Sequence, residues 1–303
     1  MADLKVNIAG VDFKNPIITA SGTYGFGQEY NELFDISKLG GISCKGLTLE
    51  PRIGNPPPRI AETPAGILNS VGLQNPGVRS FVSDSLPWLK QKDLVVIANV
   101  AGSTYEDYIE AVEIVSDSDT DMIELNISCP NVKEGGVAFG VSCLSVELIT
   151  KAVRNACKKP LIVKLSPNVS NIGDIALAAQ EAGADAISLI NTLTGMIIDI
   201  DNKRPLLKNN TGGLSGPAVF PIALRMVWEV ASRVSVPVIG MGGISTWKDA
   251  VQMFLAGASA IQIGTANFID AFAPLKILEG LEEYLDKKGH KDIGEIIGKV
   301  EAW

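Results

Sequence analysis

The sequence predicts an α/β fold, a single (β/α)8 TIM barrel, because short apolar runs alternate with longer amphipathic segments along almost the whole chain. We count eight such pairs in 303 residues, a length that one barrel commonly fills. Hydrophobic residues make up 46% of the chain and charged residues 20%, which is ample apolar material for one large core. We therefore expect residues 1–303 to form one domain rather than two.

The predicted strands are short runs rich in β-branched and other apolar residues. In chain order they span 17–20, 41–45, 94–100, 122–126, 161–165, 186–191, 238–240 and 260–263. Amphipathic patterns predict helices at 145–158, 172–182, 220–233 and 246–256. Two of these helices end in Ala-Gly-Ala, at 182–184 and 256–258, where glycine can take the left-handed conformation that stops a helix.

Three segments interrupt the plain repeat. Residues 5–15 predict a small N-terminal hairpin, with its turn at Ala9 and Gly10, that closes the bottom of the barrel. The insertions at 46–93 and 194–217, after the second and sixth strands, are too long for simple connections. Insertions of this size usually carry function or contact a partner.

Composition excludes several classes of function. The net charge of −8 argues against a nucleic-acid partner, which would need clustered Lys and Arg. No signal peptide and no membrane-spanning run are evident, so we expect a cytoplasmic protein that does not contact the membrane. The cysteines, at 44, 129, 143 and 157, show no metal-binding spacing, which predicts reduced thiols and no metal site. His290 is the only histidine and lies in a polar segment, which excludes histidine acid–base chemistry.

Each predicted strand ends in a polar residue or glycine, at the face where barrel enzymes place their chemistry. In chain order these ends are Ser21, Lys45, Asn99, Asn126, Lys164, Asn191, Gly242 with Gly243, and Gly264 with Thr265. Any one of them could be an ordinary turn residue. Two lysines and three asparagines at successive ends instead indicate a binding site, in which the lysines would meet an anion.

The last two strand-end loops, at 240–245 and 263–267, have the glycines that let backbone N–H groups approach a phosphate. The glycine-rich segment 22–27 has the wrong spacing for a dinucleotide fingerprint. We therefore expect a phosphate-bearing ligand in this chain, and we do not expect the chain to bind a nicotinamide nucleotide by itself.

A lone cysteine follows the fourth strand, within the run 126–131 and before the glycine-rich segment 132–140. Cys129 stands between Ser128 and Pro130 at a strand end, which is a poor position for a small apolar core residue. This placement indicates a reactive thiol beside amide groups that can hold a polar ring.

With these residues assembled, the chain resembles the class 1 dihydroorotate dehydrogenases, FMN-containing barrels that oxidise dihydroorotate to orotate in pyrimidine (UMP) biosynthesis. The resemblance extends from about residue 4 to the last barrel helix. It rests on the segments 15–22, 45–46, 69–75, 126–131, 164–167, 191–192, 212–216, 240–243 and 264–265. Cysteine at 129 resembles class 1, because the membrane-associated class has serine there and an N-terminal extension.

The subclass follows from the first loop. Residues 21–27, with Glu29 and Tyr30, resemble the catalytic subunit of the B type. That resemblance implies a heterotetramer of two catalytic and two electron-transfer subunits. The electron-transfer subunit would carry FAD and a [2Fe–2S] cluster and pass electrons from FMN to NAD. This chain has neither the cysteines that would bind the cluster nor a dinucleotide-binding fold. Both absences agree with a separate subunit that transfers the electrons to NAD.

The resemblance also implies roles for individual residues. Cys129 would be the base that removes the C5 proton of dihydroorotate while the C6 hydride moves to FMN. Substrate would bind Lys45, Asn69, Ser70, Val71, Gly72, Leu73, Asn126, Asn191 and Thr192, with Asn131 as a further candidate. FMN would bind Ser21, Lys45, Gly46, Asn99, Asn126, Lys164, Ile190, Gly216, Gly242, Gly243, Gly264 and Thr265. Residues 132–140 would form a lid.

Three alternatives stay open at this point. The fumarate-linked A type differs from the B type mainly in local residues. A flavin-free, aldolase-like barrel would use Lys45 or Lys164 to form a Schiff base. A non-catalytic barrel would serve only as a binding or scaffold subunit.

Overall fold

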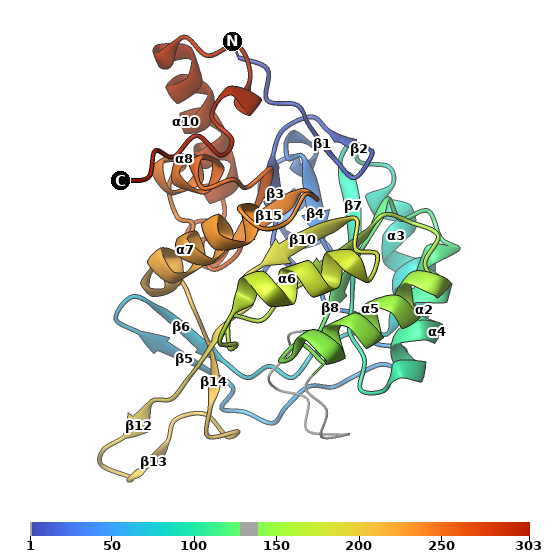
Figure 1. Cartoon of the computed structure of the whole chain (residues 1–303). Coiled ribbons are helices and arrows are strands. Elements are labelled where there is room, and N and C mark those ends of the chain that lie inside the picture. The colour runs from blue at the N-terminus through green and yellow to red at the C-terminus, as the bar shows by residue number, and fades with distance from the viewer. Residues whose placement is uncertain (1, 128–138) are drawn as a thin grey trace.

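A closed barrel of parallel strands forms the centre of the computed structural model, which describes residues 2–127 and 139–303 (Figure 1). The barrel strands are β3 (Ile17–Thr19), β4 (Gly41–Ser43), β7 (Val95–Val100), β8 (Met122–Asn126), β9 (Leu161–Lys164), β10 (Ala186–Leu189), β15 (Val238–Met241) and β16 (Ala260–Ile263). They neighbour one another in chain order, and β16 pairs with β3 to close the ring. The predicted fold class and all eight predicted strands are confirmed, with strand ends that differ by at most two residues.

Helices follow the strands and surround the barrel. The longer ones are α4 (Tyr105–Ser116), α5 (Cys143–Ala156), α6 (Ile172–Glu181), α7 (Phe220–Ala231), α8 (Trp247–Leu255) and α10 (Ala273–Lys288). The shorter ones are α1 (Gln28–Asn31), α2 (Val78–Ser80), α3 (Leu86–Leu89), α9 (Ala266–Ile269) and the non-α turns η1 (Ile36–Lys38), η2 (Phe81–Ser85), η3 (Pro217–Val219) and η4 (Ile293–Glu295). Thr104, Ser142 and Thr246 each begin a helix with a capping box. All four predicted helices are present, with ends that differ from the predicted ones by at most two residues.

The N-terminal hairpin seals one end of the barrel, as predicted. It consists of β1 (Val6–Ile8) and β2 (Val11–Phe13), paired antiparallel. Ile8 and Phe13 are buried and pack against residues at the beginnings of the barrel strands. This end is filled by apolar side chains, which leaves the opposite end for a site.

Side chains from alternate strands fill the barrel in layers, as expected for this fold. The first, third, fifth and seventh barrel strands contribute a layer of isoleucines, Ile18, Ile97, Ile162 and Ile239. The even strands contribute the next layer towards the carboxyl ends, Ser43, Glu124, Ser188 and Gln262, all fully buried. We call these four residues the polar layer. The barrel interior thus changes from apolar to polar between these two layers.

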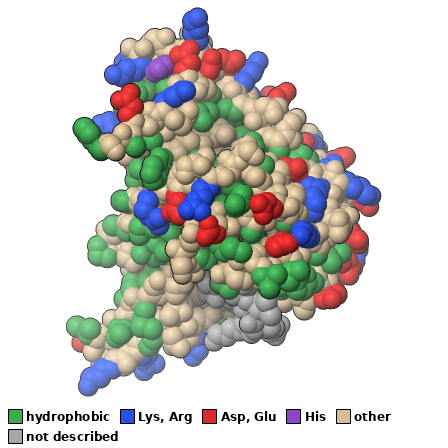
Figure 2. Space-filling model, viewed as in Figure 1, with side chains coloured by type: hydrophobic (Ala, Val, Ile, Leu, Met, Phe, Trp, Pro, Cys, Tyr) green, Lys and Arg blue, Asp and Glu red, His purple; other side chains and the backbone are tan. Residues whose placement is uncertain are grey.

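The two long insertions pair with each other. Strands β11 (Leu193–Gly195), β14 (Gly212–Ser215), β6 (Gly66–Asn69) and β5 (Ile60–Thr63) form one antiparallel sheet, in that order. In this sheet Gly213 lies opposite Asn69, so segments far apart in the chain become neighbours. A small arm of β12 (Ile198–Asp199) and β13 (Arg204–Pro205) extends away from the barrel (Figure 1). Hydrophobic side chains gather on this arm in Figure 2, and Ile200 is 83% exposed.

Replacing Gly66 should separate the two insertions, because a Cβ there would lie 2.0 Å from the backbone oxygen of Ser215. We expect Gly66→Ala to speed amide hydrogen exchange in β6 and β14, since overpacking costs about 1–3 kcal/mol. Gly10→Ala is the matched control, because Gly10 also has a positive φ, of 85°, but its Cβ would meet nothing within 4 Å. That control should leave exchange in β6 and β14 unchanged; equal exchange in the two variants would contradict the close approach.

Candidate active site

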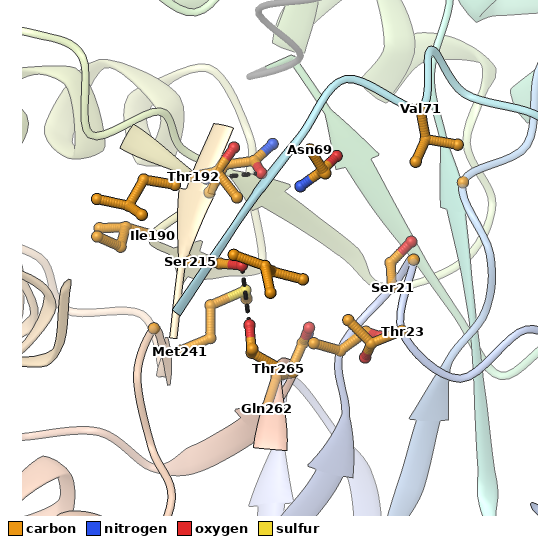
Figure 3. A pocket seen from close by; sticks show the side chains of 18 of the residues that line it. Ser21, Thr23, Asn69, Val71, Ile190, Thr192, Ser215, Met241, Gln262 and Thr265 are labelled. Atoms are coloured by element: carbon orange, nitrogen blue, oxygen red, sulfur yellow. Dashed lines mark hydrogen bonds between the residues drawn. The ribbon is translucent and has the colours of Figure 1, made fainter. Parts of the chain in front are cut away.

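A cavity of about 300 Å³ opens at the carboxyl ends of the barrel strands. Its floor and sides come from the strand ends, and its outer wall comes from β6 and β14 (Figure 3). The predicted site residues that line it are Ser21, Lys45, Gly46, Asn69, Val71, Gly72, Leu73, Asn126, Lys164, Ile190, Asn191, Thr192, Gly242, Gly243, Gly264 and Thr265. The fold therefore brings together strand ends and an insertion that are distant in sequence.

Three predicted site residues do not line the cavity. Asn99 is fully buried beneath it, and its amide nitrogen lies 2.5 Å from a carboxylate oxygen of Glu124. Ser70 is fully buried as well, and its backbone N–H donates to the carbonyl of Arg59. Gly216 comes directly after Ser215, which does line the cavity. Binding roles for these three residues stay predictions.

The predicted base and lid fall largely outside the described residues. Cys129 and Asn131 belong to 128–138, and so does most of the segment 132–140. Asn126, three residues before Cys129, lines the cavity. The role of Cys129 stays a prediction from sequence.

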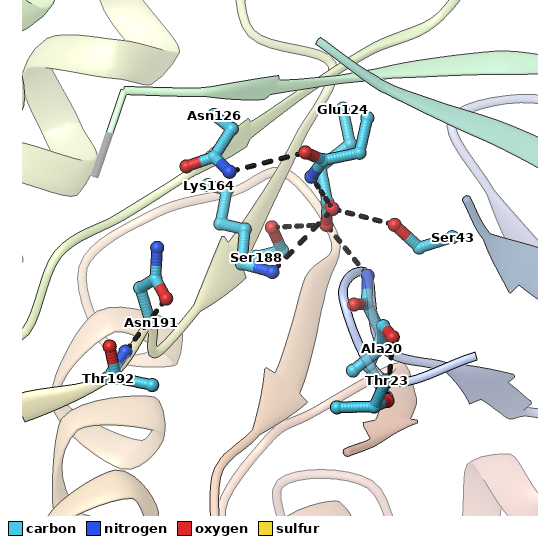
Figure 4. Close-up of polar contacts among 11 residues, drawn as sticks. Ala20, Thr23, Ser43, Glu124, Asn126, Lys164, Ser188, Asn191 and Thr192 are labelled. Atoms are coloured by element: carbon cyan, nitrogen blue, oxygen red, sulfur yellow. Dashed lines mark hydrogen bonds and ion pairs between the residues drawn. The ribbon is translucent and has the colours of Figure 1, made fainter. Parts of the chain in front are cut away.

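A buried carboxylate that the sequence analysis missed lies below the cavity floor. Oε2 of Glu124 accepts hydrogen bonds from Oγ of Ser43 at 2.8 Å and from Asn99. Its Oε1 accepts from Oγ of Ser188 at 2.8 Å and from Nε2 of Gln262 at 2.7 Å. Nζ of Lys164, itself nearly buried, lies 3.8 Å from Oε2 (Figure 4). The polar layer and two neighbouring strand ends thus converge on one side chain.

These contacts keep Glu124 ionised. Burial alone would raise its pKa, but the Lys164 ammonium and hydrogen bonds from Asn99, Ser188 and Gln262 outweigh burial and lower the pKa below its ordinary value. A signal for this site exists in the sequence: Glu124 and Gln262 are the polar residues within the apolar runs 122–125 and 260–263. A polar residue in the middle of a buried barrel strand points inward or is paired.

The carboxylate also orients the amides around it, because an ionised carboxylate only accepts hydrogen bonds. Asn99 turns its NH₂ group towards Glu124, so its Oδ1 accepts from Nδ2 of Asn126 at 3.2 Å. Gln262 likewise turns its NH₂ group towards Glu124, and its Oε1 is buried without a hydrogen-bond partner among the described residues. Gln262 lines the cavity, so a donor on a bound molecule would satisfy this acceptor.

One side of the cavity fits a phosphate. Gly243 has φ of 74°, and a Cβ there would lie 2.7 Å from the backbone nitrogen of Phe220, so the loop needs glycine. Oγ1 of Thr265 donates to Oγ of Ser215 at 2.8 Å, which brings two hydroxyl groups to the same wall (Figure 3). Glycine-rich backbone and hydroxyl groups are typical phosphate ligands.

Other classes of site find no support in the part of the chain that the structure describes. Across residues 2–127 and 139–303, no group of three or more His, Cys, Asp or Glu side chains could hold a metal ion. None of the helices in these ranges is both long enough and apolar enough to cross a membrane.

Comparison with known proteins identifies close relatives over the full length. The model of the dihydroorotate dehydrogenase family matches residues 3–285. The dihydroorotate dehydrogenase B (NAD(+)) catalytic subunit of Bacteroides thetaiotaomicron is 58% identical over 303 residues, which is all of both chains. Its counterparts in Caldicellulosiruptor bescii and Petrotoga mobilis are 56% and 55% identical, over 98% and 99% of this chain and 99% and 100% of their own. These matches include both insertions.

The lowered pKa of Glu124 predicts a pH-dependent contribution to stability. A carboxyl group whose pKa is lower in the folded state stabilises the fold above its unfolded pKa, and that contribution is lost as the pH falls through the folded pKa. At pH 7 Glu124→Gln should lower the free energy of unfolding by about 3–5 kcal/mol, because it leaves a buried cation unpaired. The gap between variant and parent should narrow as the pH falls below about 4.

Chemical denaturation between pH 3 and pH 7 measures this gap. Glu147→Gln is the matched control, because Glu147 forms an exposed ion pair with Lys151 one helical turn away. It should cost only about 0.3–0.5 kcal/mol. A Glu124→Gln penalty as small as that of the control, or one that does not change with pH, would contradict the ionised, buried state.

Proposed function

The chain belongs to the dihydroorotate dehydrogenase family, and we propose that it is the FMN-containing catalytic subunit of an enzyme that oxidises dihydroorotate to orotate in pyrimidine biosynthesis. The observation that carries this proposal is the cavity at the strand ends, where two lysines, several amides and two glycine loops converge. The names of the relatives favour NAD as the final electron acceptor, rather than fumarate, and favour a dehydrogenase over a Schiff-base aldolase or a scaffold subunit.

The residues present fit FMN. The loops at Gly243 and Thr265 suit its phosphate, the Lys164 ammonium suits the polar edge of its ring, and the unpartnered Oε1 of Gln262 suits a ring N–H. Bound FMN would supply the acceptor for the hydride from C6 of dihydroorotate. We propose that the contacts come from Ser21, Lys45, Gly46, Asn99, Asn126, Lys164, Ile190, Gly216, Gly242, Gly243, Gly264 and Thr265.

The substrate side of the proposed site carries one cation and several amides. Lys45 would pair with the carboxylate of dihydroorotate, and Asn69 and Asn191 would hydrogen-bond its ring amides. Two contacts fix Asn191 and Thr192: Oδ1 of Asn191 accepts from the backbone N–H of Thr192 at 2.8 Å, and the carbonyl of Thr192 accepts from Nδ2 of Asn168 at 3.1 Å. Ser70 to Leu73 would contribute backbone contacts. Asn126 would contribute its side-chain amide.

We propose Cys129 as the base that takes the C5 proton, because the resemblance to the family assigns it that role and it follows Asn126, which lines the cavity, by three residues in the sequence. Only the thiolate can accept a proton, and a free thiol has a pKa of about 8.5. The rate of proton removal should therefore rise with pH unless the site lowers that pKa.

Replacing Cys129 tests this role. Cys129→Ala should slow anaerobic bleaching of the flavin by dihydroorotate by about 10²–10⁴-fold, while FMN stays bound. Cys143→Ala is the matched control, because that thiol is exposed and does not line the cavity, and it should bleach at the parent rate. Parent-like bleaching by Cys129→Ala would remove Cys129 from the mechanism. A chain that cannot be reconstituted with FMN would contradict the whole proposal.

NAD reduction is proposed to need a second subunit, because this chain lacks a dinucleotide fingerprint and its relatives are named catalytic subunits. We propose an electron-transfer subunit with FAD and a [2Fe–2S] cluster, in a heterotetramer with two copies of each chain in the cytoplasm. Two exposed apolar regions support association with other chains: the β12–β13 arm, and Phe268 at the cavity with the adjacent Ile269.

The need for a second subunit is tested by measuring NAD reduction with dihydroorotate, with and without the electron-transfer subunit. The chain alone should reduce an artificial dye with dihydroorotate but should not reduce NAD. Adding the electron-transfer subunit should restore NAD reduction. NAD reduction by the isolated chain would contradict the need for a partner.

A further inference from the structure

The buried carboxylate of Glu124 lies below the cavity and contacts groups that line it. Glu124 does not line the cavity, yet two of its partners, Lys164 and Gln262, do. A third partner, Asn99, links it to Asn126, which also lines the cavity. A charge held one contact away from a site acts on it through its electric field and through the groups that it orients.

Lys164 is the first of these groups. Its side chain is 5% exposed and that of Glu124 is fully buried, so water screens their interaction very little. Together they form an ion pair with no net charge directly under the cavity. The positive charge that a ligand experiences from Lys164 is therefore partly offset by Glu124.

Gln262 is the second group. Its NH₂ group is committed to Oε1 of Glu124, so the atom that it can offer to a ligand is its own Oε1. The ring of oxidised FMN carries one N–H group, in the imide of its pyrimidine part. A buried acceptor without a partner matches that donor.

We infer that Glu124 is a positioning residue for the cofactor: it offsets the charge of Lys164 and turns Gln262 so that Oε1 accepts a hydrogen bond from the ring imide. This inference rests on the proposed binding of FMN in the cavity. It assigns Gln262 as a further cofactor contact and gives the polar layer a role beyond packing.

The charge on Glu124 can be separated from its shape by two variants. Glu124→Gln removes the charge, whereas Glu124→Asp keeps the charge and shortens the side chain. The midpoint potential of bound FMN should become more positive in Glu124→Gln, because an unopposed Lys164 favours the added negative charge of the reduced ring. It should stay close to the parent value in Glu124→Asp. Equal potentials in the two variants would overturn the charge effect, since a merely structural role predicts no difference.

The orientation of Gln262 is tested by binding alone, without turnover. The parent apoprotein should bind FMN at least about tenfold more tightly than 3-methyl-FMN, which lacks the imide N–H. Gln262→Leu should bind both flavins with nearly equal affinity, at about the level of the methylated flavin in the parent. If Gln262→Leu still prefers FMN by the parent ratio, the imide contact is wrong.

These readouts separate the inference from the proposed function. Failure of the parent chain to bind FMN would sink the proposed function itself. Parent-like potential and flavin preference in variants that still bleach with dihydroorotate would overturn only the inference. If Glu124→Gln does not fold, Gln262→Leu leaves the ion pair in place and carries the test.

Discussion

The arrangement of the site depends on one buried negative charge. Burying an ionised carboxylate costs several kcal/mol unless it is paired and hydrogen-bonded. Glu124, on β8, meets that requirement through four neutral donors and one ammonium. Its partners come from β4, β7, β9, β10 and β16. Correct register in six of the eight barrel strands is thus coupled to a satisfied charge, and the same charge orients the groups under the cavity.

The rest of the cavity comes from segments outside the barrel repeat. The insertions after the second and sixth barrel strands form one sheet, in which β6 and β14 are neighbours. Asn69 and Ser215 project from these strands into the cavity. The barrel therefore supplies the charged floor and the glycine loops, and the inserted sheet supplies the wall where we place part of the substrate contacts. In barrel enzymes the segments at the strand ends can vary while the barrel stays the same, so these segments can determine which substrate binds.

Much of this architecture can be predicted from sequence because its signals are local. Apolar runs ending in Lys45, Asn126 or Lys164 identify both the strands and their functional ends. The hairpin at Ala9 and Gly10 is equally local. The pairing of β6 with β14 is not local, because it joins residues about 145 positions apart, and no short pattern encodes it.

The sequence marks Glu124 as unusual, but the partners that define its role cannot be predicted, for a related reason. Within its own strand it is one polar residue in an apolar run. Its partners become neighbours only when the barrel closes and side chains from alternate strands meet in one layer.

Crystallography of the chain with bound FMN is the decisive test of how this site holds its cofactor. We predict the phosphate at Gly243 and Thr265, and the ring within hydrogen-bonding distance of Nζ of Lys164 and Oε1 of Gln262. A flavin bound elsewhere, or a ring that contacts neither group, would contradict it.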